Sequence, residues 1–590
     1  MATSFSPRTG GGADAERFRR ALSGPRLHPL LIFSLLFTLL FLLHAPLLRL
    51  PYFWDEAGYY VPAARDLLLT GSLIPHSTVS NAHPPLVMAW LAAWWKFSGY
   101  TSAVTRTAML LVAAFGLLAV FRLARNISNL PVAVAATACT ALYPVYFAQS
   151  SMAHVDMAAA AFSLWAITFL LERRVGWSIA AFCLAVLAKE TALVVPIALA
   201  IWHLFWRIRS SARENRFAPP LLPTIQIFLL LFAPTFTLSA WYAYHYLHTG
   251  YVFGNPGFFQ YNVTGTLHPL RIGLALLKRL WQVTGYMNLF LLTVAAGMAM
   301  VFPPQADVLR GRPRGRIPLN IQGIFAVVIG ADVICFSIIG GAPLARYMLT
   351  ALPLVMIVCV STVWRRMREW PLVIGVVCAG FVLALFVNPP YPFALEDNLA
   401  YRDYVVLHKR AAGLVAAHYA GSRVLTAWPA TDELKHPYLG YSRISMPVVP
   451  IDDFSMPSLL AAAHNPAQYD LALLFSTKYE PAHDVSAAWS LWQRWQERFF
   501  GYHRDLSPEA AAGVLGGRTV FRESRNGQWI ALVQIERSEE ADLISGAVSG
   551  RAVASASYRD FRQAVQTQSA AASPVRGGSG PAPQLPVAPY

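Results

Sequence analysis

The chain has little charge and few cysteines, and both shortages exclude familiar classes of protein. Only 13% of its 590 residues are charged, whereas 56% are hydrophobic. A soluble domain usually has about 25% charged residues. This composition excludes a disordered chain or an ordinary soluble enzyme, and it indicates an integral membrane protein. The five cysteines lie in apolar stretches, so the sequence has neither a disulfide framework nor the ligand spacing of a zinc site.

The remaining charge is distributed unevenly along the chain. Residues 1–390 contain 29 Lys and Arg but only 12 Asp and Glu, whereas residues 391–590 contain 18 and 19. We therefore expect a basic, apolar membrane block and a separate polar block. The predicted organisation is a cytoplasmic segment at 1–27, a transmembrane domain at 28–390, an extracytoplasmic α/β domain at 391–540 and a disordered tail at 541–590.

Eleven apolar runs are long enough to suggest membrane spans, which need about 20 residues. The sequence therefore predicts an all-α polytopic bundle of about eleven transmembrane helices. A shorter, Trp-rich run at 84–97 fits a helix at the membrane interface better than a span. The eleven runs are 28–48, 103–121, 131–149, 153–171, 175–189, 191–206, 222–247, 280–303, 318–340, 347–364 and 371–388.

The orientation of the bundle follows from the positions of Lys and Arg. With a cytoplasmic N-terminus, the six inward-facing segments hold 20 of the 29 basic residues before residue 391, as the positive-inside rule requires. Eleven spans then place the C-terminal domain outside the cytoplasm. The net charge of +16 is explained by topology, so we expect no nucleic-acid partner.

The polar block has a mixed pattern of helix-like and strand-like runs. The last span ends at Pro389 and Pro390, because proline interrupts a helix. We expect strands at 423–427, 471–475 and 529–535, and helices at 400–418, 457–463 and 486–499. The fold class is therefore a helical membrane bundle with a small C-terminal α/β domain.

Acidic residues at the outer end of the bundle are the first candidates for a reaction, because buried charge is costly in a membrane. Asp55 and Glu56 follow the first span in an aromatic segment that also contains Tyr59 and Tyr60. The alternative is that these acids are N-terminal charges of an interfacial amphipathic helix.

Further polar side chains fall on the same predicted face of the membrane. They are His83, His154, Asp156, Lys189 and Glu190. Carboxylates, histidines and a lysine that converge on an apolar bundle fit a site for acid–base chemistry. A local ion pair is the simpler alternative for the adjacent Lys189 and Glu190.

This ordered set resembles the GT-C glycosyltransferases. The Asp55-Glu56 pair, His83-Pro84-Pro85-Leu86, Asp156 and Lys189-Glu190-Thr191 are similar to segments of family 39, which includes protein O-mannosyltransferases and aminoarabinose transferases. Ala345-Arg346-Tyr347 before the tenth span is similar to an Arg-Tyr segment of these enzymes. The resemblance covers about residues 28–364.

The resemblance implies sugar transfer from a polyprenyl-phosphate donor to an acceptor hydroxyl outside the cytoplasm, with inversion. Asp55 matches the family's first-loop aspartate and is the candidate base. Glu56 would orient Asp55 or the acceptor, and Asp156 would position the acceptor or hold a basic partner. The partners would be the lipid-linked sugar, membrane lipids and a glycan, lipid or protein acceptor. No cofactor is implied with certainty, and a role of Asp156 in binding a divalent metal stays open.

The donor phosphate needs cationic or hydrogen-bonding partners. Arginine is the best match for phosphate oxygens, so Arg346 is the first candidate, although an interfacial arginine is the alternative. The remaining candidates are Tyr347, His83, Lys189 and Arg271 for the phosphate, and His154, Glu190, Tyr59 and Tyr60 for the acceptor or for support.

A lipid or glycolipid transporter or flippase is the competing interpretation. Such a protein would use the same buried charges along a translocation path. We disfavour it because the sequence shows no inverted repeat and because the charges gather on one face.

Overall fold

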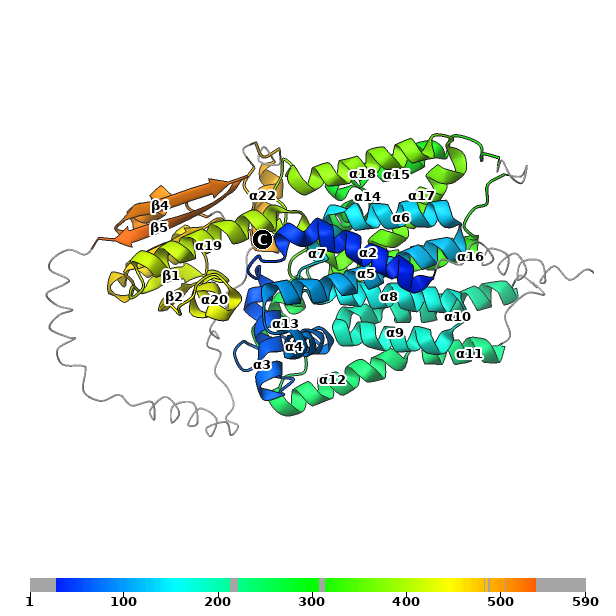
Figure 1. Cartoon of the computed structure of the whole chain (residues 1–590). Helices are drawn as coiled ribbons and strands as arrows, with labels where there is room; N and C mark the ends of the chain where they lie inside the picture. Colours follow the sequence, from blue (N-terminus) through cyan, green and yellow to red (C-terminus); the bar gives the residue numbers. More distant parts are fainter. Residues whose placement is uncertain are drawn as a thin grey trace, which may run out of the picture.

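The computed structural model describes residues 28–212, 221–306, 313–481, 483–485, 489–502 and 505–536. The predicted segments 1–27 and 541–590 lie outside these residues. The described chain forms a bundle of roughly parallel helices with a smaller α/β part at one end (Figure 1). The predicted fold class is therefore confirmed.

Helices before residue 250 form the first half of the bundle. They are α2 (Pro29–His44), α3 (Val61–Thr70), α4 (Leu86–Ser98), α5 (Ser102–Ile127), α6 (Leu130–Leu142), α7 (Pro144–Gln149), α8 (Val155–Leu171), α9 (Val175–Ala188), α10 (Val194–Ala212), α11 (Leu221–Leu230) and α12 (Ala233–Thr249), with short turns at η1 (Ala45–Leu47), η2 (Glu56–Tyr60) and η3 (Glu190–Leu193).

The elements from residue 256 to residue 397 form the second half of the bundle. Its elements are α13 (Pro256–Asn262), η4 (Thr264–Thr266), α14 (Pro269–Thr284), η5 (Tyr286–Asn288), α15 (Phe290–Ala299), α16 (Leu319–Ile338), η6 (Ala345–Met348), α17 (Ala351–Arg366), α18 (Trp370–Phe386) and η7 (Leu395–Asp397).

Side-chain caps and prolines set the helix ends. Thr101 accepts a hydrogen bond from the Val104 N–H at the start of α5, and Asn129 does the same for the Val132 N–H at the start of α6, which satisfies N–H groups without a partner in the helix. The predicted span 131–149 is not a single helix: Tyr143 is extended before Pro144, so α6 and α7 are separate helices.

The predicted span 280–303 is also interrupted. Its first residues complete α14, and Met287 then adopts a φ of +46° between the two helices, a left-handed conformation that stops a helix. Within the described residues, four helical stretches are long and apolar enough to cross a membrane: Pro29–Leu47, Ser102–Ile127, Ile225–Thr249 and Leu319–Ile338. The predicted number of eleven spans stays a prediction.

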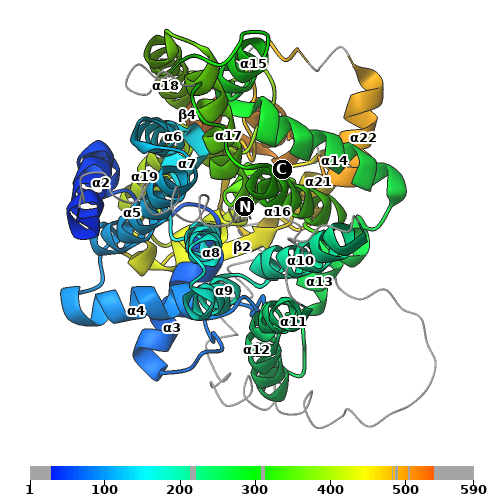
Figure 2. The ribbon, with the colours of Figure 1, turned by 90° about the vertical axis from the view of Figure 1, so that its right-hand side faces the viewer.

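Figure 2 looks at the bundle from the end opposite the α/β part. Helices α8 and α17 lie in its interior, whereas α2, α12 and α18 lie at its outside. Accordingly, most residues of α8 are buried, but α2 exposes Leu31, Leu35 and Leu42. A helix that exposes leucines in this way suits contact with lipid.

The α/β part contains one mixed five-stranded sheet. Its strand order is β2-β1-β3-β5-β4, with β1 parallel to β2 and β3, and β5 antiparallel to β3 and β4. All three predicted strands are present, while β2 and β4 were not predicted. The strands are β1 (Val424–Ala427), β2 (Val448–Ile451), β3 (Leu471–Phe475), β4 (Gly517–Arg525) and β5 (Gln528–Ile535), and the helical elements are α19 (Ala400–His418), α20 (Ala430–Lys435), η8 (Pro437–Leu439), α21 (Met456–Ala463), η9 (Pro466–Gln468), α22 (Ser490–Phe500) and α23 (Pro508–Leu515).

The two parts share a continuous apolar core. Phe53, in the loop after α2, packs its ring against Tyr401 and Tyr404 of α19, with ring centroids 6.0 and 5.2 Å apart. The Tyr441 hydroxyl also donates a hydrogen bond to the Tyr52 carbonyl at 2.8 Å. These contacts hold the segment that carries Asp55 against the α/β part.

Candidate active site

A cavity of about 740 Å³ lies where the end of the bundle meets the α/β part. Eight of the predicted site residues line it. They come from the loop after α2, the start of α4, the α9–α10 junction and η6. These residues are Asp55, Tyr59, Tyr60, His83, Lys189, Glu190, Arg346 and Tyr347.

Arg346 connects three carboxylates at the wall of this cavity. Its Nη2 lies 2.5 Å from Asp55 Oδ2, its Nη1 lies 2.5 Å from Glu396 Oε2, and its Nε lies 3.3 Å from Asp156 Oδ2. Arg346 is 3% exposed and Asp55 is 9% exposed. The planar guanidinium therefore fixes two carboxylates of the bundle and one of the following segment in a single cluster.

A second cation completes this cluster. Lys189 Nζ lies 2.6 Å from Asp156 Oδ1 and 4.0 Å from the centre of the Tyr347 ring. Burial by itself lowers the pKa of Arg346, but the nearby carboxylates outweigh burial and raise its pKa well above the usual value. Arg346 therefore stays charged, and the cluster combines two basic side chains with three acidic ones.

Lys189 and Glu190 do not form the local ion pair that was the simpler alternative for these two residues. Lys189 pairs with Asp156 rather than with its neighbour, while Glu190 Oε2 lies 2.8 Å from His83 Nδ1. Lys189, Glu190 and His83 line the cavity on the side of the bundle. His83 is thus held by a carboxylate next to the cavity.

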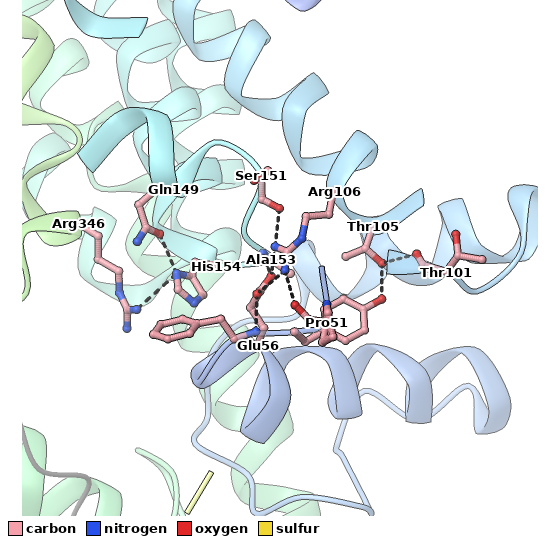
Figure 3. A network of polar contacts seen from close by, with 12 residues as sticks. Pro51, Glu56, Thr101, Thr105, Arg106, Gln149, Ser151, Ala153, His154 and Arg346 are labelled. Atoms are coloured by element: carbon pink, nitrogen blue, oxygen red, sulfur yellow. Dashed lines mark hydrogen bonds and ion pairs between the residues drawn. The ribbon is translucent and has the colours of Figure 1, made fainter. Parts of the chain in front are cut away.

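His154 contacts Arg346 but does not line the cavity. Its Nδ1 lies 2.7 Å from Gln149 Oε1 and 3.4 Å from Arg346 Nη1 (Figure 3). The His154 ring thus lies between the Gln149 amide and the Arg346 guanidinium.

Glu56 lies outside the cavity, in contrast to Asp55. Its carboxylate binds the Arg106 guanidinium at 2.8 and 3.0 Å and accepts hydrogen bonds from the N–H groups of Phe53 and Ala153 (Figure 3). Glu56 and Arg106 are both fully buried. The predicted direct role of Glu56 in orienting the acceptor thus has no support in the geometry, which gives this residue the task of holding the turn that presents Asp55.

Replacement of Glu56 by Gln should destabilise the protein. The substitution leaves the Arg106 charge buried without its carboxylate, and loss of one partner of a buried pair costs about 3–5 kcal/mol. We expect a lower midpoint of thermal unfolding for the full chain in detergent, and Glu369→Gln, at an exposed acid, is the matched control. An unchanged midpoint would contradict this structural role.

Arg271 does not line the cavity, although its partner Gly340 does. Its guanidinium donates hydrogen bonds to the backbone carbonyls of Gly340 and Gly341 at 2.6 and 2.8 Å. Burial lowers its pKa. Its contacts tie α14 to the segment before Arg346, so its predicted phosphate contact is not part of this geometry.

Three side chains of the site were not predicted from the sequence. Glu396, in η7, contacts Arg346, and Trp428 and Asp432 line the cavity from the α/β part. Glu396 lies just beyond the apolar block, and the pair of adjacent acids Glu396 and Asp397 eight residues after the last apolar run is a signal that could have identified it. Trp428 and Asp432 carry no comparable signal, because only the fold brings them to the cavity.

The described residues contain no group of three His, Cys, Asp or Glu side chains arranged to hold a metal ion. The three carboxylates at Arg346 face its guanidinium. The geometry therefore assigns these carboxylates to cation pairing within the protein.

Residues 82–238 match the family model described as dolichyl-phosphate-mannose-protein mannosyltransferase. The predicted resemblance is thereby confirmed. This stretch includes His83, His154, Asp156, Lys189 and Glu190, and of these His83, Lys189 and Glu190 line the cavity. No curated protein matches the chain in sequence.

Solved structures that are similar to the chain include the following two. ArnT from Cupriavidus metallidurans bound to undecaprenyl phosphate has 13% identity and a TM-score of 0.48, with 85% of this chain and 97% of that chain covered. AglB from Archaeoglobus fulgidus, in complex with an inhibitory peptide and a dolichol-phosphate, has 12% identity and a TM-score of 0.36, with 86% and 74% covered.

Proposed function

We propose that the protein is a membrane glycosyltransferase that moves a sugar from a polyprenyl-phosphate donor to an acceptor hydroxyl. The observation that carries this proposal is the cavity in which Asp55 meets Arg346 and Lys189. A carboxylate beside two cations offers a base for a hydroxyl and positive charge for a phosphate in one place. The match to the mannosyltransferase family model over residues 82–238 supports the same class of reaction.

Asp55 acts as the general base in this reaction. Its carboxylate takes the proton of the acceptor hydroxyl while the acceptor oxygen attacks the anomeric carbon of the sugar. The bond between that carbon and the phosphate oxygen breaks, and the phosphate leaves with the electron pair. A single displacement of this kind inverts the configuration at the anomeric carbon.

Arg346 couples the base to the leaving group. In the structure Arg346 contacts Asp55, Asp156 and Glu396. When Asp55 gains a proton, its attraction for the guanidinium falls at the moment when the phosphate gains negative charge. Arg346 and Lys189 then stabilise the departing phosphate, and Tyr347 donates its hydroxyl hydrogen bond to the same group.

The reaction takes place on the extracytoplasmic side. The distribution of basic residues supports this placement, because it puts Asp55, Arg346 and the α/β part on the face opposite the arginine-rich segments. The donor tail would stay in the membrane while its phosphate reaches the end of the bundle.

A transfer assay tests this function directly. The full chain in proteoliposomes is supplied with undecaprenyl-phosphate sugars labelled in the sugar, together with lipid, glycan and protein fractions as acceptors. We expect label to move to one class of acceptor and free undecaprenyl phosphate to accumulate. Movement of intact lipid across the bilayer without sugar transfer would contradict the proposal and support the flippase alternative.

A further inference from the structure

The α/β part completes the cavity with an aromatic ring and a carboxylate. Trp428 directly follows β1, and Asp432 lies on α20, the next helix. Strand β1 is parallel to both of its neighbours, and side chains at the carboxyl ends of parallel strands often form binding sites. Trp428 and Asp432 are both half-buried, so part of each side chain stays accessible at the cavity.

Trp428 is held tightly against the turn that carries Asp55. A Cβ atom at Gly58 would lie 2.5 Å from Trp428 Cζ2, so glycine is needed for this close approach. The indole ring also lies 5.5 Å from the Tyr59 ring and 5.6 Å from the Trp54 ring, measured between centroids. These contacts fix the orientation of the indole next to the proposed base.

Asp432 is positioned by its neighbours as well. Its carboxyl group interacts with the Trp428 side chain, and the next residue, Glu433, lies 2.6 Å from His408 Nδ1 of α19. The His408–Glu433 pair anchors α20 inside the α/β part. Asp432 therefore faces the cavity from a helix that is held in place. Its negative charge interacts with Tyr59, and the charge of Asp55 interacts with Tyr59 as well.

We propose that Trp428, Tyr59 and Asp432 form the subsite that holds the ring of the transferred sugar. The C–H face of a sugar ring packs on an aromatic surface, and a carboxylate accepts strong hydrogen bonds from hydroxyl groups. Tyr59 lies close to both Asp55 and Asp432, so a ring bound here has its anomeric carbon near Asp55 and its hydroxyls near Asp432. The α/β part thus selects the sugar, while the bundle supplies the base and the phosphate contacts. This inference rests on the proposed function.

Binding of a bare lipid, compared with binding of lipids that carry a sugar, separates a role in sugar recognition from a general structural role. The probes are undecaprenyl phosphate alone and undecaprenyl phosphate carrying mannose, galactose or arabinose, measured on the full chain in nanodiscs. The wild type should bind one sugar-bearing lipid more tightly than the bare lipid. Trp428→Ala and Asp432→Asn should each reduce that preference about tenfold, since loss of stacking or of a charged hydrogen bond has effects of this order.

Matched variants control for folding and for loss of a similar side chain elsewhere. Trp428→Phe keeps an aromatic surface and should retain most of the preference. Trp489→Ala and Asp452→Asn, at exposed positions of the α/β part, should leave it unchanged. Affinity for bare undecaprenyl phosphate should stay the same in all of these variants.

Two results would overturn the subsite. One is an unchanged sugar preference in Trp428→Ala and Asp432→Asn, and the other is an equal loss of affinity for the bare lipid. If the wild type still transfers sugar in either case, the proposed function stands and only the subsite fails. A wild type that neither prefers a sugar-bearing lipid nor transfers sugar contradicts both.

Discussion

Asp55→Asn should lower the rate of sugar transfer by about 10²–10⁴-fold, the usual contribution of a general base. Asparagine has nearly the same shape as aspartate and can still accept a hydrogen bond from Arg346, but it cannot take a proton from the acceptor hydroxyl. The substitution also removes a negative charge 2.5 Å from Arg346 Nη2. Affinity for undecaprenyl phosphate should therefore stay the same or become tighter.

This combination of effects distinguishes a lost base from a damaged site. Transfer is measured with labelled donor in proteoliposomes, and binding is measured with the bare lipid on the same preparation. Asp452→Asn, at an exposed position of the α/β part, should have neither effect. Wild-type transfer by Asp55→Asn would exclude Asp55 as the base.

Arg346→Lys should lower transfer by about 10²–10³-fold, the effect of removing one group that stabilises developing negative charge. An ammonium group has no planar fork and cannot contact Asp55, Asp156 and Glu396 in the way that the guanidinium does. The variant keeps the positive charge but loses the planar group that contacts the carboxylates. Affinity for undecaprenyl phosphate should fall as well, unlike in Asp55→Asn.

The control for this variant is Arg443→Lys, at an exposed arginine of the α/β part. The midpoint of thermal unfolding should fall for Arg346→Lys, because three buried carboxylates then share a poorer partner. Transfer at the wild-type rate would show that Arg346 has no role at the phosphate.

The predicted membrane face holds the charged side chains that the bundle contributes to the cavity, which are Asp55, Lys189, Glu190 and Arg346. Acidic and basic residues are rare in this apolar block, so the few at its outer end could be identified from composition and topology alone. The sequence could not show which of two neighbouring acids faces the cavity. Asp55 does so because Arg106, a residue of α5, binds Glu56 on the other side of the turn.

The contribution of the α/β part needed the three-dimensional fold. Strands β1, β3 and β5 are short apolar runs and could be predicted, whereas β4 carries charged residues that hide its pattern. Trp428 reaches the cavity only because β1 ends beside Gly58. Long-range packing of this kind leaves no periodic signal in the sequence, and so Trp428 and Asp432 were missed.

The stereochemistry of the product tests the central claim most directly. A single displacement with Asp55 as the base requires the new glycosidic bond to have the opposite anomeric configuration to the donor. Proton NMR of the product formed from a donor of known configuration measures this. We predict inversion, and a product that retains the configuration of the donor would contradict the account.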